Sequence, residues 1–367
     1  MLLYIALTLW FMIVVLLGIR KDAVQVAVTW PNIPNNRVIR QNNRISKLVV
    51  LMSMLVLWML TAFRSTSIGN DTLTYVEYFY YFSNYGIIRD SRFEIGYQYL
   101  NIAIGWISKN PHIFLVLISS IMYIGLSYCL FRYSRNILIS ATLFFCYGFS
   151  LYINIFRQGI AMIIVLFAYQ HLKKNNRLYA FLLIIFASFF HISALICLLL
   201  FFNTHYIYKK KVTLLCSLLC LALAFSGYVE VIASVVFPEY LHYFDSKYAS
   251  TGWLAVTIAL IRNATLYCLV ASVNKVKDKA NYRITLMNFF CLLEIGALGY
   301  SVNLFDRLSN YFLLIALIEL PNILYQYNIK YRNTWILGIC IYSIIMFLLI
   351  LALRPEWNHL YPYKFYN

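Results

Sequence analysis

Long, nearly uncharged apolar stretches recur from one end of this 367-residue chain to the other. A helix that spans a bilayer needs roughly 20 consecutive apolar residues, and fewer where the helix is short or broken. Twelve stretches qualify, and several in the middle of the chain are short enough to form hairpins or bent helices. They are 2–18, 48–63, 112–131, 137–151, 157–170, 178–190, 192–207, 212–236, 253–273, 284–300, 308–327 and 334–353. The pattern predicts an all-α polytopic membrane protein with about 12 transmembrane helices.

The composition excludes other classes of protein. Hydrophobic residues make up 62% of the chain and charged residues only 12%. In an average soluble domain about 45–50% of the residues are apolar and about 25% are charged. A soluble globular protein, a disordered chain and a disulfide scaffold are therefore excluded. The eight cysteines all lie inside apolar stretches and have no CxxC spacing. We therefore expect neither a disulfide framework nor a metal site.

Basic residues gather in alternate connectors, which sets the expected orientation. Lysine and arginine favour the cytoplasmic side of a membrane, so alternation places these connectors in the cytoplasm and both ends of the chain outside. The net charge of +17 then reflects cytoplasmic loops beside anionic lipid and not a nucleic-acid partner. The outward connectors include 64–111 and 237–252. We expect these to be two periplasmic loops of one transmembrane domain over 1–367.

The cytoplasmic connectors are too short to form a nucleotide-binding domain, and they contain no Walker or GxGxxG motif. An ATP-driven pump, a kinase and a sugar-nucleotide enzyme with a cytoplasmic catalytic domain are therefore disfavoured. Eight of the 13 acidic residues lie in the outward connectors. We therefore expect the reacting groups to lie on the outer side of the membrane.

The first outward connector combines aromatic rings with charged side chains. Its segment 94–108 mixes apolar and polar residues at helical spacing, which predicts an interfacial or re-entrant helix better than a span. Aromatic faces stack on sugar rings, and polar side chains bind their hydroxyls. The alternative is an interfacial aromatic belt with a solvated loop. The candidate residues here are Asp71, Tyr75, Tyr78, Arg89, Arg92 and Glu94.

Arg157 interrupts a long apolar stretch, with Gln158 and Gly159 directly after it. A charged side chain at the centre of a bilayer costs roughly 2.5–3.5 kcal/mol, but it is tolerated at a hairpin tip or in a polar cavity. The glycine would let a backbone or a ligand approach closely. A guanidinium can bind phosphate through two hydrogen bonds. The alternative is an arginine that snorkels to the interface.

Two further polar positions are expected at the same depth. His191 lies at the expected turn of a hairpin and can act as a general base near neutral pH, although a lone histidine on an apolar face is more often a satisfied core residue. Asp306 and Arg307 adjoin at the outer end of a span, where such a pair is often only a helix-end ion pair. If Asp306 orients Arg307 towards Arg157 and His191, three hairpins converge on one site.

Five short motifs follow one another between about residue 70 and residue 311. They are Asp71-x-x-x-Tyr75-x-x-Tyr78, Glu94-x-Gly96-Tyr97, Phe156-Arg157-Gln158-Gly159-x-Ala161, Phe190-His191-x-Ser193-Ala194 and Asp306-Arg307-Leu-x-x-Tyr311. Their order and spacing resemble the EpsG family of membrane proteins, which are similar to Wzy-type O-antigen and capsule polymerases.

The resemblance implies a polymerase-like, ligase-like or GT-C-like fold and a metal-independent glycosyltransferase. Such an enzyme joins oligosaccharide repeat units carried on undecaprenyl diphosphate, at the periplasmic face of the bacterial inner membrane. The growing chain is the donor, its lipid diphosphate is the leaving group, and the new repeat unit is the acceptor. No cofactor and no nucleic acid are implied. The expected partners are the two lipid-linked oligosaccharides, membrane lipid and, by analogy with the family, a chain-length co-polymerase.

The resemblance also suggests roles. Arg157 and Arg307 would bind the donor diphosphate, and His191 is the first choice of base for the acceptor hydroxyl. Asp71 or Glu94 is the rival base. The other expected substrate-binding residues are Asp306, Gln158, Arg89, Arg92, Tyr75 and Tyr78. The competing functions are a flippase or transporter for lipid-linked oligosaccharide, and another membrane glycosyltransferase or acyltransferase. Transporters often carry inverted repeats, and the sequence shows none.

Overall fold

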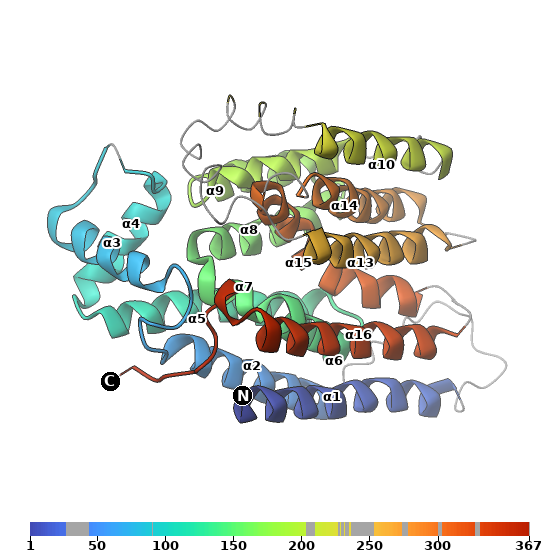
Figure 1. The fold of residues 1–367 in the computed structure, drawn as a ribbon, viewed down its shortest axis with the longest axis horizontal. Coiled ribbons are helices and arrows are strands. Elements are labelled where there is room, and N and C mark those ends of the chain that lie inside the picture. Colours follow the sequence, from blue (N-terminus) through green and yellow to red (C-terminus); the bar gives the residue numbers. More distant parts are fainter. Residues whose placement is uncertain are drawn as a thin grey trace. The chain divides into compact units, whose positions relative to one another are not determined.

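The structure is a computed structural model (Figure 1). It describes residues 1–26, 44–89, 91–202, 210–226, 253–273, 278–299, 303–326 and 331–366, together with the single residues 228, 231 and 235. Within these ranges every regular element is a helix, and the β contacts are limited to one isolated antiparallel bridge between Arg64 and Phe365. The all-α expectation is confirmed. The expected second periplasmic loop, 237–252, lies outside the described residues.

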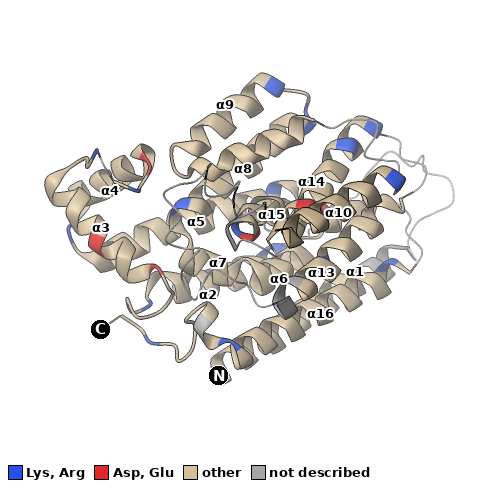
Figure 2. Ribbon diagram, turned by 45° about the horizontal axis from the view of Figure 1, so that its top comes forward, with Lys and Arg blue, Asp and Glu red and all other residues tan. Residues whose placement is uncertain are grey.

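Five helices in the described part are long and apolar enough to cross a membrane. They are α1 (Leu2–Val26), α2 (Arg44–Ala62), α5 (Pro111–Tyr133), α15 (Asn303–Gln326) and α16 (Arg332–Leu353). Figure 2 shows that most of the ribbon carries no charged residue, as a polytopic membrane protein requires. The expected number of twelve spans is not confirmed.

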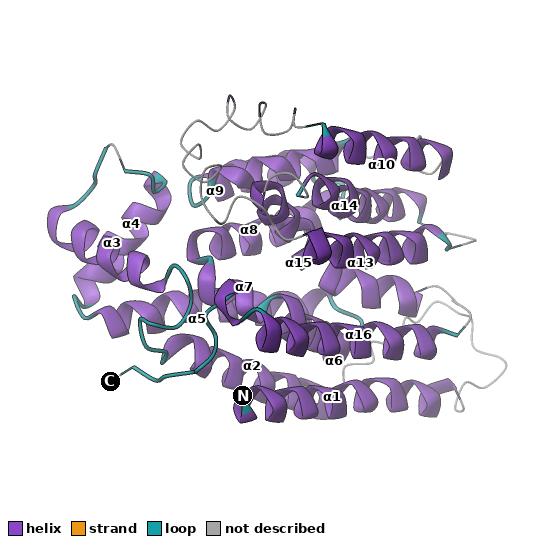
Figure 3. Ribbon diagram, viewed as in Figure 1, coloured by secondary structure: helices purple, strands orange, loops and turns teal. Residues whose placement is uncertain are grey.

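The remaining helices are shorter or less apolar (Figure 3). They are α3 (Thr72–Tyr85), α4 (Ile95–Ile107), α6 (Ile137–Tyr147), α7 (Phe149–Asn154), α8 (Phe156–Lys173), α9 (Arg177–Ser188), α10 (Lys210–Phe225), α13 (Trp253–Ala271) and α14 (Lys279–Leu298), with the 3-10 helices η1 (Ile192–Phe201) and η4 (Pro355–Trp357).

The chain divides into two compact units. The first contains Met1–Ile163, Ala187–Ile192 and Leu324–Asn367, and the second contains Ile164–Phe186 and Ser193–Ile323. The division passes through the continuous helix α8. The expectation of one transmembrane domain over 1–367 stays a prediction.

In the first unit, α6 packs against α1, α2 and α16. Its first ten residues are all buried, and its Phe145 ring lies 4.4 Å from Phe11 and 4.7 Å from Phe347. A helix that is apolar on every face forms the core of its unit. The expected stretch 137–151 is interrupted, as expected for the bent helices in the middle of the chain: α6 ends at Tyr147, and α7 begins after Gly148, where the Phe144 ring occupies the place of a Cβ atom.

The connector after α2 contains two helices, where the sequence predicted one. The expected helix 94–108 is present as α4, and α3 packs against it. The Lys109 ammonium donates to the Ser83 carbonyl and so joins the end of α3 to the end of α4. Exposed rings, among them Tyr99 and Trp106, face outward from this pair. The interfacial position of α4 stays a prediction.

In the second unit, one buried carboxylate joins three helices. Glu319 of α15 is 1% exposed, and its Oε2 lies 2.8 Å from Lys173 Nζ of α8. Thr285 Oγ1 of α14 donates to the same oxygen over 3.3 Å and lies 3.0 Å from the hydroxyl of Tyr169. A buried charge needs an opposite charge and further hydrogen bonds, and this network supplies both.

Candidate functional site

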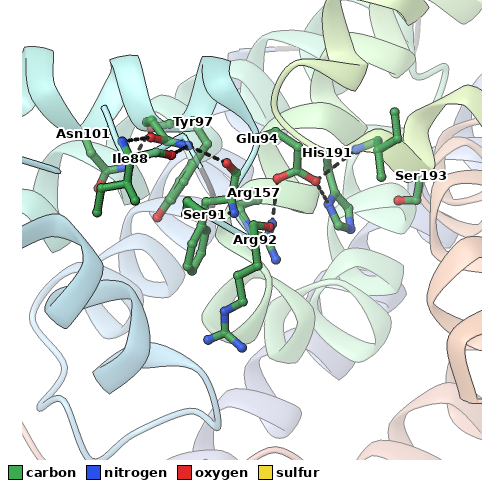
Figure 4. Close-up of polar contacts among 12 residues, drawn as sticks. Ile88, Ser91, Arg92, Glu94, Tyr97, Asn101, Arg157, His191 and Ser193 are labelled. Atoms are coloured by element: carbon green, nitrogen blue, oxygen red, sulfur yellow. Dashed lines mark hydrogen bonds and ion pairs between the residues drawn. The ribbon is translucent and has the colours of Figure 1, made fainter. Parts of the chain in front are cut away.

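Three segments of the first unit meet at the carboxylate of Glu94 (Figure 4). Glu94 is the N-cap residue of α4, but its side chain does not cap that helix. Its Oε2 accepts a hydrogen bond from Arg157 Nη1, in the first turn of α8, over 2.6 Å. Its Oε1 lies 2.7 Å from His191 Nδ1 and accepts from the backbone N–H of Ile192 over 3.1 Å. We call this arrangement the Arg157–Glu94–His191 triad.

The triad is largely shielded from solvent, with side chains that are 14–16% exposed. Burial alone would raise the pKa of Glu94, but the hydrogen bond from His191 and the charge of Arg157 outweigh it and lower the pKa to about 2. Glu94 is therefore an anion at neutral pH. An anionic acceptor at Nδ1 fixes the imidazole tautomer with its proton on Nδ1, which leaves the lone pair on Nε2.

A close backbone contact brings Glu94 to His191. The N–H of Gly96 donates to the carbonyl of Phe189 over 2.9 Å. A Cβ atom at position 96 would lie only 2.7 Å from that carbonyl oxygen. Only glycine lets the first turn of α4 approach the end of α9 this closely. The motif Glu94-x-Gly96 thus has a physical reason that the sequence did not reveal.

An aromatic cluster lies beside the triad, formed by Tyr75, Tyr78, Phe93, Tyr97 and Phe156. Phe93 is its centre, with ring centroids 4.3 Å from Tyr78 and 5.7 Å from Tyr97. Tyr75 is buried and lies 5.0 Å from Phe156, so it shapes the cluster. Tyr78 is half-buried and keeps part of its ring exposed.

Two guanidinium groups lie against Phe93. Cζ of Arg157 is 4.4 Å from the ring centroid and Cζ of Arg92 is 5.3 Å from it, distances typical of cation–π contacts. Arg157 Nη1 also donates to the carbonyl of Arg92 over 3.1 Å. The Arg92 side chain is exposed, points away from Glu94 in Figure 4, and has no hydrogen bond or ion pair within the described residues. Arg89 is likewise exposed.

The other expected site residues have different surroundings. Gln158 is 3% exposed, next to Arg157. Asp71 is the N-cap residue of α3 without a side-chain cap bond, and no contact joins its carboxylate to the triad. Asp306 and Arg307 lie in the first turns of α15, in the second unit. The structure thus joins Arg157 to His191, and the convergence of Arg307 with them stays a prediction.

The sequence missed the role of Arg64, which is fully buried. Its guanidinium donates to Thr72 Oγ1, to the Thr61 carbonyl and, over 3.0 Å, to the Ile153 carbonyl at the end of α7. Cζ lies 4.8 Å from the Phe156 ring centroid. Burial lowers the pKa of Arg64 to about 10, so the group stays charged. It holds the start of α3 to the break before α8 and so positions Arg157.

Among the described residues, no three His, Cys, Asp or Glu side chains gather as metal ligands do. The triad can therefore be described by its own groups: an oriented imidazole, an anionic carboxylate and a guanidinium, with a second guanidinium exposed beside them.

The fold and the site define a polytopic α-helical membrane protein in which a carboxylate, an imidazole and a guanidinium meet, largely shielded from solvent. Residues 47–365 match the EpsG family. Because the match covers most of the chain, the protein belongs to the EpsG family. No curated protein and no solved structure is detectably similar to it. Family membership assigns the chain to polysaccharide biosynthesis in a membrane, as a polymerase type of enzyme.

Proposed function

We propose that the protein is a polymerase that joins oligosaccharide repeat units carried on undecaprenyl diphosphate, at the periplasmic face of the bacterial inner membrane. The observation that carries the proposal is the Glu94 carboxylate, which binds Arg157 and His191 together. A transferase that works without a nucleotide sugar needs a base for the acceptor hydroxyl and positive charge for the leaving diphosphate.

His191 acts as the base. Glu94 holds its Nδ1 proton, so Nε2 removes the proton from the acceptor hydroxyl as that oxygen attacks the donor sugar. The imidazolium that forms is stabilised by the carboxylate 2.7 Å away, as in other carboxylate–histidine pairs. Glu94 itself is a poor base because its pKa is low and its oxygens are occupied.

The reaction balances without a cofactor. The acceptor oxygen forms the new glycosidic bond to the anomeric carbon of the growing chain, and the bond from that carbon to the phosphate oxygen breaks. The bonding electron pair leaves on the lipid diphosphate, and the proton of the hydroxyl goes to His191. A direct displacement of this kind inverts the anomeric centre.

Arg92 binds the diphosphate more directly than Arg157 does. Nη1 of Arg157 donates to Glu94 and to the Arg92 carbonyl, so it fixes the site and supplies background positive charge. The exposed guanidinium of Arg92 keeps its donors for a phosphate, and the rings of Tyr78 and Phe93 hold it in place. Arg307 stays the sequence-based candidate for a second phosphate ligand.

The test is a polymerisation assay with purified protein in nanodiscs. The substrate is the undecaprenyl-diphosphate repeat unit from the same gene neighbourhood, with EDTA and without nucleotide sugar. We expect a ladder of products separated by one repeat unit. His191→Ala and Arg92→Ala should abolish or strongly reduce it, and Arg44→Ala, which removes an exposed guanidinium at the start of α2, should not.

No ladder from folded protein and verified substrate would refute the polymerase proposal. The same substrate would then be tested for translocation across a bilayer, because the flippase alternative predicts movement without a new bond. Equal losses in Arg92→Ala and Arg44→Ala would show that only general positive charge matters and would overturn the role of Arg92.

A further inference from the structure

A strap formed by the C-terminal residues 354–366 crosses the connector between α2 and α3 in the first unit. The N–H of Ser65 donates to the Lys364 carbonyl over 2.9 Å, and the N–H of Tyr366 donates to the Phe63 carbonyl over 2.8 Å. These two bonds flank the antiparallel bridge of Arg64 with Phe365. The strap is therefore paired with the connector through its main chain.

Further bonds fix the strap along its length. The N–H of Gly69 donates to the His359 carbonyl over 3.0 Å. Asn70 Nδ2 donates to the Trp357 carbonyl over 2.7 Å, and the hydroxyl of Tyr363 donates to the Leu60 carbonyl over 2.7 Å. A segment held in this way presents its outward side chains in a fixed arrangement. Such a surface loses little conformational entropy when it binds a ligand.

The strap and the connector border an open surface hollow of about 520 Å³, a volume within the usual range of ligand sites. Its lining residues are Ser65, Thr66, Lys364, Phe365 and Tyr366. The Phe365 side chain is 60% exposed. The exposed Lys364 ammonium has no hydrogen bond or ion pair with a described residue. The hollow thus combines an open ring face, three hydroxyl groups and an unneutralised cation.

The Tyr366 ring of the hollow is held in place by packing against other rings. His112 stacks on Tyr366, with ring centroids 4.6 Å apart and planes 7° apart. Phe63 makes an edge-on contact with the same imidazole, with ring centroids 5.4 Å apart. The orientation of Tyr366 is therefore set by the protein before any ligand arrives.

The chemistry of the lining fits a carbohydrate. The C–H face of a pyranose packs on an exposed aromatic ring, while its hydroxyls need donors and acceptors at the rim. Ser65 and Thr66 supply both, and Lys364 supplies a charge suited to an acidic sugar. A lipid chain would offer no hydrogen bond to Thr66 or Lys364 and would leave the Lys364 charge facing an apolar ligand.

We propose that this hollow is a saccharide subsite, separate from the triad, that holds part of the oligosaccharide chain during polymerisation. The inference rests on the proposed function for its ligand. The connector leads directly into α3, whose Tyr75 contacts Phe93 and Phe156 beside the triad. A chain held by the strap therefore stays on the same unit as the Arg157–Glu94–His191 triad between additions.

The test measures binding and product length separately. The probe is lipid-free oligosaccharide of two to four repeat units, released from the organism's own polymer, added to protein in nanodiscs. We expect Phe365→Ala and Lys364→Ala to weaken binding about tenfold, since loss of one stacking contact is about that large. We also expect shorter products with an unchanged rate for the first joining step. The control is Tyr99→Ala, an equally exposed ring on α4.

The outcomes separate this inference from the proposed function. His191→Ala should lose polymerisation and keep probe binding. Wild-type probe affinity and product length in both strap variants would overturn the inference while the polymerase proposal stands. Absence of all products from the wild-type protein would overturn the polymerase proposal instead. The native cysteines that are not buried, Cys216, Cys220 and Cys268, are first replaced by serine. If Phe365→Cys in that chain reacts with lipid-phase but not with water-soluble thiol reagents, the ring faces lipid and the subsite does not exist.

Discussion

Glu94→Gln tests the centre of the site, because it keeps the shape of the side chain and removes its charge. The carboxylate accepts hydrogen bonds from Arg157 and His191 at once. An amide has only one accepting oxygen, so its NH2 group must face one of two donors. We expect activity to fall by about 10²-fold or more, because the imidazole loses both its fixed tautomer and the anion that stabilises its charged form.

The effect on stability follows from the pKa of Glu94. Burial opposes ionisation, but His191 and Arg157 lower this pKa from its ordinary 4.5 to about 2. At about 1.4 kcal/mol per pKa unit, the folded protein gains about 3 kcal/mol from the ionised group. A lowered pKa gives stability that is complete above pH 4.5 and disappears as the pH falls towards 2. The glutamine variant should lack this pH dependence.

The assays are the polymerisation ladder, its pH–rate profile and thermal unfolding in detergent between pH 7 and pH 3. The matched control is Glu77→Gln, an exposed glutamate of α3, which should behave as wild type. In Glu94→Gln the acid limb of the pH–rate profile should move to lower pH, because the imidazolium has lost its anion. Equal behaviour of the two variants in all three measurements would refute the role given to Glu94.

Three other variants probe the elements that build the site and the fold. Gly96→Ala should reduce activity more than tenfold, because the added Cβ atom meets the Phe189 carbonyl. Gly159→Ala should be tolerated, because the added Cβ atom meets only the flexible end of a methionine side chain. Equal activities of the two variants would contradict this. Arg64→Lys should lower the free energy of unfolding by about 1–3 kcal/mol, because the single nitrogen of an ammonium cannot reach three acceptors that the guanidinium contacts through three different nitrogens. An unchanged melting temperature would oppose it. Glu319→Ala should destabilise the folded protein by about 3 kcal/mol, because it leaves the partly buried Lys173 ammonium without its opposite charge. An unfolding midpoint equal to that of the wild type would contradict the network.

The apolar stretches predicted most helices, because hydrophobicity and helical spacing are local properties of a sequence. Among the described residues, five of the twelve expected spans lie in helices that are long and apolar enough to cross a membrane, whereas α6 is apolar but only 11 residues long. Helix α3 was missed, because its tyrosines and threonines favour strands and belts as much as helices. Its helical form depends on packing against α4 and α5.

The candidate site, like the fold, could be predicted from the sequence only where the signal is local. The turn at His191 and the helix start at Arg157 were predicted from a polar residue within an apolar stretch, and both lie at such breaks. Glu94 was proposed only as a rival base, because nothing in one sequence shows that residues 94, 157 and 191 meet. Arg64 resembled a solvated loop residue, although it is fully buried. Contacts between distant segments decide these roles.

The charges of the site explain why two neighbouring arginines serve different ends. With Glu94 ionised, the charge of Arg157 is balanced by the carboxylate, and Arg92 leaves one positive charge exposed. A diphosphate beside Arg92 reverses that balance, and the added negative charge favours a positive imidazole. In the proposed reaction, His191 therefore becomes a stronger base when the donor is bound, and removal of the acceptor proton is coupled to the presence of the leaving group. Glu94 supports this coupling because it keeps Arg157 from competing for the phosphate and keeps Nε2 of His191 as the nitrogen that accepts the proton.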